Sequence, residues 1–134
     1  MNTKLNFKQI ITAGAVAAGI SVVINAILFF AFHSIGVITD NVFVQPNQPL
    51  TVVPVIISSI FPTLIGTLVF FLFEKYTANG FKIFSIVAGT LVVLSFSSPF
   101  TAVQGMPISY GIVLNVMHVV VASSLLFFIN RAKK

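Results

Sequence analysis

The sequence predicts an all-α integral membrane protein, an up-down bundle of four helices. Three observations support this: an apolar composition, four long apolar stretches, and basic residues confined to alternate connections. Of the 134 residues, 57% are hydrophobic and 7% are charged, and the mean hydropathy is +1.10. A soluble domain carries about a quarter charged residues to cover its surface. Most of this chain must therefore be solvated by lipid.

Four stretches are long enough to cross a hydrocarbon core, which takes roughly 20 helical residues. They cover about 10–35, 52–73, 83–103 and 109–129, within a single membrane domain over 1–134. In lipid each backbone amide must be satisfied within its own segment, so these spans are helices. The first continues beyond the length of a signal-peptide core, and we expect it to be an uncleaved helix.

The basic residues give the expected orientation. All seven lie before the first span, between the second and third, or after the fourth: Lys4, Lys8, Lys75, Lys82, Arg131, Lys133 and Lys134. The outer loop 36–51 and the turn 104–108 contain none. The positive-inside rule therefore predicts that both termini are cytoplasmic. The net charge of +5 is a topology signal and not a sign of nucleic-acid binding.

The connections are short, which makes neighbouring helices antiparallel. The longer loop 36–51 contains the segment "VFV" at 42–44, which could form a short strand.

One face of each helix carries small or polar residues, and we expect these faces to point inward, because helices associate in lipid through close packing and hydrogen bonds. The faces comprise Gly14, Ala18, Ser21 and Asn25 in the first span; Ser59, Thr63, Gly66 and Phe70 in the second; Ser85 and Gly89 in the third; and Gly111, Asn115, His118 and Ala122 in the fourth.

Two prolines lie inside predicted spans. Pro62 and Pro99 each remove a backbone hydrogen bond and should kink their helices. Nearby serines can bond the freed carbonyls. Whether the bends are static or act as hinges is left open at this stage.

His118 stands in the apolar run "NVMHVVVASSLL", roughly 13 Å from the outer end of the fourth span. Asn25 lies at a similar depth, and Asn115 is one turn away. A buried polar group needs a partner, so we expect His118 to bond Asn25, Asn115 or a serine. One interpretation makes these residues contacts that fix helix register. The other makes them part of a ligand or proton path.

His33 lies at the outer rim, where it could reach Asp40 in the following loop. Its depth differs from that of His118 by roughly 10 Å, so the two do not flank one haem iron. Haem bound by His118 alone stays open as an alternative, but no cofactor and no metal site are predicted.

The absent motifs narrow the function. There is no cysteine, no Ser-His-Asp set, no HExxH motif and no phosphate-binding loop. The two carboxylates, Asp40 and Glu74, lie in the outer loop and at the inner rim. A proton-coupled cation exporter needs an acidic group near the midplane. The sequence thus shows no evident catalytic site and argues against that transporter class.

A set of residues gives the chain a family resemblance: Leu114 with Met117 to Ala122, Ser95 and Pro99, Glu74-Lys75, and Pro54 at the start of the second span. In these residues it resembles the small four-helix bacterial membrane proteins that form a domain family of unknown function. The resemblance implies a bacterial cytoplasmic membrane and a domain of nearly the whole chain. It implies no activity.

Together these observations favour a non-enzymatic membrane protein: an accessory subunit, or a binder of an apolar ligand or lipid within the bundle. The expected partners are the bilayer and a membrane protein or a second copy of the chain. The first alternative is a haem- or quinone-linked redox protein that uses His118. The second is a small transporter or channel subunit.

Overall fold

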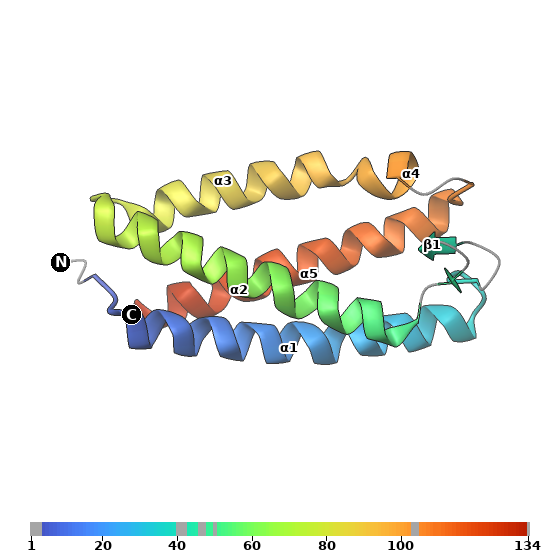
Figure 1. The fold of residues 1–134 in the computed structure, drawn as a ribbon, viewed down its shortest axis with the longest axis horizontal. Helices are drawn as coiled ribbons and strands as arrows, with labels where there is room; N and C mark the ends of the chain where they lie inside the picture. The colour runs from blue at the N-terminus through green and yellow to red at the C-terminus, as the bar shows by residue number, and fades with distance from the viewer. Residues whose placement is uncertain (1–3, 40–42, 46–47, 50, 103–104, 134) are drawn as a thin grey trace.

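Four antiparallel helical segments form the protein (Figure 1), as the sequence predicts. A computed structural model describes residues 4–39, 43–45, 48–49, 51–102 and 105–133. The long helices are α1 (Phe7–Ser34), α2 (Val52–Tyr76) and α5 (Ile108–Ala132). Each is long and apolar enough to span a membrane. The protein is a small multi-pass integral membrane protein.

The third segment is divided into α3 (Gly80–Ser95) and α4 (Ser98–Ala102). The sequence predicts one helix with a kink at Pro99, but the chain leaves the helix at Phe96 and Ser97, before the proline. Pro99 then lies in the first turn of α4, where a missing N–H costs little. Around the break, the hydroxyls of Ser95, Ser97 and Ser98 donate to carbonyls three residues earlier, at 2.7, 3.2 and 2.7 Å. By contrast, α2 continues through Pro62 as one helix.

A short antiparallel hairpin follows α1 and pairs β1 (Phe43–Gln45) with β2 (Gln48–Pro49). The sequence predicts a strand at 42–44, one residue earlier. Asn6 begins α1 with a capping box: its side chain accepts from the Gln9 amide at 2.8 Å, and its own amide donates to the Gln9 side chain at 3.0 Å.

The buried faces agree with prediction for two helices and differ for two. Gly14, Ala18, Ser21 and Asn25 are buried in α1, and Ser59, Thr63 and Phe70 are buried in α2. The predicted face of α3, however, lies outside: Gly89 is exposed and has open space around it. On α5, Gly111 is buried as predicted, whereas Asn115 and Ala122 are half-buried and His118 is exposed. The core instead receives Tyr110, Val113, Met117, Leu125 and Ile129.

The reason for this difference is the position of α3. It packs on α2 and α5, on the side of the bundle away from α1 (Figure 1). The closely packed core is therefore made by α1, α2 and α5. Both α2 and α5 also turn a second, less buried face toward α3.

Candidate functional site

A polar layer crosses the core of α1, α2 and α5 between two apolar clusters. One cluster, which includes Ala17, Phe70 and Ile129, lies toward the basic end, and the other, which includes Phe29 and Met117, lies toward the hairpin. The Asn25 amide donates to the Ser59 hydroxyl at 2.9 Å and to the Met117 carbonyl at 3.4 Å. One side chain thus connects three helices.

The layer combines satisfied and unsatisfied polar atoms. The hydroxyls of Ser59, Thr63 and Thr67 each donate to the carbonyl four residues earlier, at 2.8, 2.6 and 2.6 Å. Among the described residues, the buried Ser21 hydroxyl and the Asn25 carbonyl oxygen have no hydrogen-bond partner. Hydrogen bonds of this kind between helices are typical of contacts that fix helix register in membranes.

His118 does not join this layer. Consecutive helical residues are turned by about 100°, so the burial of Met117 in the core directs His118 to another face of α5. Its side chain is exposed, and within the described ranges it makes no hydrogen bond to Asn25, Asn115 or a serine. The contact expected from the sequence is absent, because Asn25 of α1 packs against one side of α5, whereas His118 projects from another side.

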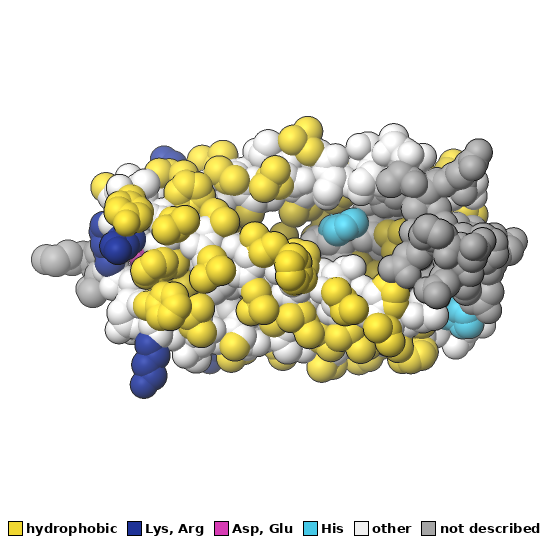
Figure 2. All heavy atoms as spheres, viewed as in Figure 1, with side chains coloured by type: hydrophobic (Ala, Val, Ile, Leu, Met, Phe, Trp, Pro, Cys, Tyr) yellow, Lys and Arg dark blue, Asp and Glu magenta, His cyan; other side chains and the backbone are white. Residues whose placement is uncertain are grey.

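His118 instead lines a cleft between α2, α3 and α5, with a volume of about 390 Å³. Figure 2 shows the hollow on this face, with a histidine at its edge. Most of the lining is apolar; Ser58, Ser95 and His118 are the polar side chains among the lining residues. A cavity of this size with a few polar groups has the character of a small-molecule site.

Small residues keep the cleft open where the helices approach each other. Pro62 and Gly66 form its α2 wall, Ala88 belongs to α3, and Ala122 belongs to α5. At Gly66 a Cβ atom would lie 2.8 Å from the Leu125 side chain, so a larger residue there would displace the lining. Gly66 and Ala122 belong to the predicted small faces, but they line the cleft instead of the three-helix core.

Asn115 supports the broken third segment. Its amide donates to the Phe96 carbonyl at 3.0 Å, at the point where α3 ends. Its own carbonyl oxygen is buried and has no partner among the described residues. Asn115 therefore helps to hold α3 against α5, one turn from His118.

His33, one of the two outer-rim candidates, is not among the residues that line this cleft. His33 is exposed near the end of α1, and its ring stacks on Phe29 with centroids 5.6 Å apart. Asp40 lies outside the described residues, and its predicted contact with His33 stays a prediction. The two histidine side chains of the chain are well separated (Figure 2).

Within the described ranges, no group of three His, Cys, Asp or Glu side chains could hold a metal ion. His118 is the one histidine among the residues that line the cleft.

Two features were missed in the sequence. Glu74 pairs with Lys133 at the far end of the chain, and not with its neighbour Lys75. The cleft itself also went unpredicted, since apolar residues at helical spacing look the same whether they line a cavity or fill a core. The available signal was Gly66 one turn after Pro62 in α2, and the small Ala122 one turn after His118 in α5.

A family model described as "Family of unknown function (DUF6069)" matches residues 6–134. The chain belongs to the DUF6069 family. This confirms the resemblance to a membrane family of unknown function. No curated protein and no solved structure matches the chain. The DUF6069 match includes every helix and the whole lining of the cleft, and it supplies no activity.

Proposed function

We propose that this protein binds an apolar ligand, a lipid or another membrane-soluble molecule, in the cleft between α2, α3 and α5. The observation that supports this most is the cavity of about 390 Å³. It contrasts with the closely packed core between α1, α2 and α5. Its apolar walls suit a hydrocarbon body. His118 can donate or accept one hydrogen bond, so it would orient a carbonyl or hydroxyl group of the ligand.

The setting of the site is part of the proposal. We place the protein in a bacterial cytoplasmic membrane with both termini inside, on the basis of its seven basic residues at one end. The ligand would then enter sideways from the bilayer, because the cleft lies on a face whose surrounding side chains are mostly hydrophobic (Figure 2).

The test fills the cleft without changing charge. Ala122→Phe places a ring in the cavity, whereas Ala15→Phe adds the same ring on an exposed position of α1. Native mass spectrometry of the detergent-purified proteins should show a bound apolar molecule on the wild type and on A15F, and none on A122F. Equal occupancy of the three proteins, or a bare wild type, would contradict the proposal and direct attention to a protein partner.

His118→Leu separates binding from folding. Since His118 has no hydrogen bond within the described protein, we expect the variant to keep the free energy of unfolding within about 0.5 kcal/mol. The same substitution should weaken ligand retention, because the apolar leucine cannot bond the polar group of the ligand. A large loss of thermal stability without any loss of ligand would assign His118 to packing.

A further inference from the structure

A second cavity lies at the basic end of the same three helices and has a different chemistry. Its volume is about 340 Å³, and its polar lining residues are Lys4, Glu74, Asn79, Lys82, Asn130 and Lys133. This is the basic end of the bundle, where the Lys and Arg side chains gather in Figure 2. Three lysines face one carboxylate across the cavity.

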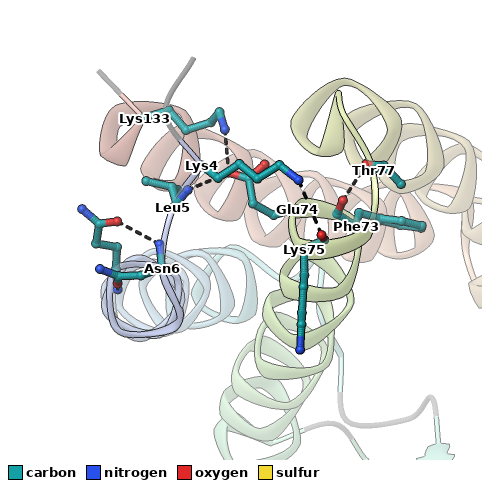
Figure 3. A network of polar contacts seen from close by, with 9 residues as sticks. Lys4, Leu5, Asn6, Phe73, Glu74, Lys75, Thr77 and Lys133 are labelled. Atoms are coloured by element: carbon teal, nitrogen blue, oxygen red, sulfur yellow. Dashed lines mark hydrogen bonds and ion pairs between the residues drawn. The ribbon is translucent and has the colours of Figure 1, made fainter. Parts of the chain in front are cut away.

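The carboxylate is already engaged. Glu74 is 3% exposed, and its Oε2 atom accepts from the Leu5 amide at 3.0 Å and from the Lys133 ammonium at 2.6 Å (Figure 3). Among the described residues, neither Lys4 nor Lys82 pairs with a carboxylate, and Lys4 reaches only the Lys75 carbonyl, at 3.5 Å. The cavity therefore keeps two cationic groups without an anionic partner from the described part of the chain.

The backbone adds to this positive field. The first turn of α3, which begins at Gly80, borders the cavity. The N-cap residue Asn79 makes no side-chain cap bond, and no acidic residue lies in the first turn. No acidic side chain of its own first turn therefore offsets the positive end of the α3 dipole, which lies beside Lys82.

From these observations we infer that the cavity binds an anionic phosphate group, one that no cation of its own molecule neutralises. The basic end of a membrane bundle lies at the level of the lipid headgroups, and basic pockets between helices bind anionic headgroups there. The anionic headgroup of a phospholipid and free inorganic phosphate share this chemistry. The inference does not depend on the proposed cleft ligand, since the two cavities have different linings.

The experiment uses the full chain in micelles that contain equal amounts of phosphatidylglycerol and phosphatidylcholine with identical acyl chains. Native mass spectrometry gives the ratio of the two lipids retained. The wild type should retain phosphatidylglycerol preferentially. Lys82→Gln should lower the ratio by about fivefold, because each lysine near the surface contributes about 1 kcal/mol, and K4Q/K82Q should lower it further.

Lys8→Gln is the matched control, because Lys8 is exposed in the first turn of α1 and does not line the cavity. It should keep the wild-type ratio, as should the charge-retaining Lys82→Arg, which also shows that position 82 tolerates substitution. The cleft variant A122F should keep the ratio as well, so that failure of the two proposals can be told apart.

Adding excess inorganic phosphate shows whether the bound phosphate group belongs to a lipid headgroup or is free phosphate. Displacement of the lipid, with a phosphate adduct in its place, would make free phosphate the occupant; persistence of the lipid would make it the headgroup. Equal retention of the two lipids by the wild type would overturn the inference, as would an equal effect of K82Q and K8Q.

Discussion

Asn25 is the residue that connects the three closely packed helices. Its amide bonds Ser59 of α2 and the Met117 carbonyl of α5, and its side chain is 2% exposed. His118 follows Met117 directly, yet it lines the cleft and contributes no hydrogen bond to the described protein. Two polar residues predicted at similar depth thus lie in different places, one in the core of α1, α2 and α5 and one at the cleft.

A double-mutant cycle tests the packing role. Asn25→Ala and Ser59→Ala should each lower the free energy of unfolding in detergent, with a coupling of about 0.6 kcal/mol between them, typical of hydrogen bonds between membrane helices. Thermal unfolding midpoints or denaturant titrations measure these changes. Strictly additive effects would show that the two side chains do not interact.

At the scale of the elements, the close approach of α1 to α2 depends on a glycine. A Cβ atom at Gly14 would lie 2.6 Å from the Thr67 Cγ2 atom. Thr67 is buried and β-branched, so it cannot turn away easily. By contrast, Gly80 and Phe84 are the buried residues of α3, and no atom lies within 4 Å of a Cβ added at Gly89.

Gly14→Ala should therefore destabilise the protein by about 1–3 kcal/mol, the usual effect of overpacking. Gly19→Ala is the control on the same helix, because no atom lies within 4 Å of its added Cβ. We expect it to be neutral or slightly stabilising, since alanine favours the helix. Thermal unfolding of both variants gives the comparison, and equal midpoints would disprove the close contact. Thr67→Ala in the G14A background should restore part of the loss.

At the scale of the molecule, polarity is divided between the two ends. One end carries the basic residues and the Glu74–Lys133 ion pair, which joins the end of α5 to α2. Glu74 also accepts a hydrogen bond from the Leu5 amide, which joins the segment before α1 to α2. The other end carries the hairpin and connections without Lys or Arg. The proposed orientation in a bilayer rests on this asymmetry. The polar cavity lies at the basic end, and the apolar cleft is lined by residues nearer the middle of α2 and α5.

The orientation is tested with single cysteines, for which the chain is suited because it has none of its own. Asn79→Cys lies at the turn between α2 and α3, and Ser109→Cys lies in the first turn of α5; both positions are exposed. In intact cells a membrane-impermeant maleimide should label S109C and leave N79C unlabelled until the membrane is opened. The reverse pattern would place the termini outside.

The sequence by itself determined the class of protein. Apolar stretches of membrane length and the need to satisfy every backbone amide leave helices as the solution, and short connections make them antiparallel. The buried faces of α1 and α2 were also predictable, because Gly14, Ser21 and Asn25 recur at helical spacing and both helices contact two neighbours.

Only the tertiary structure decided how α3 packs, and with it the candidate site. Periodicity gives the faces of a helix but not its neighbours, and α5 has one face toward α1 and another toward α3. The sequence therefore placed His118 beside Asn25, whereas the bundle places it at the cleft. The pairing of Glu74 with Lys133 could not be predicted from the sequence either, since it joins residues 59 positions apart through the packing of α2 against α5.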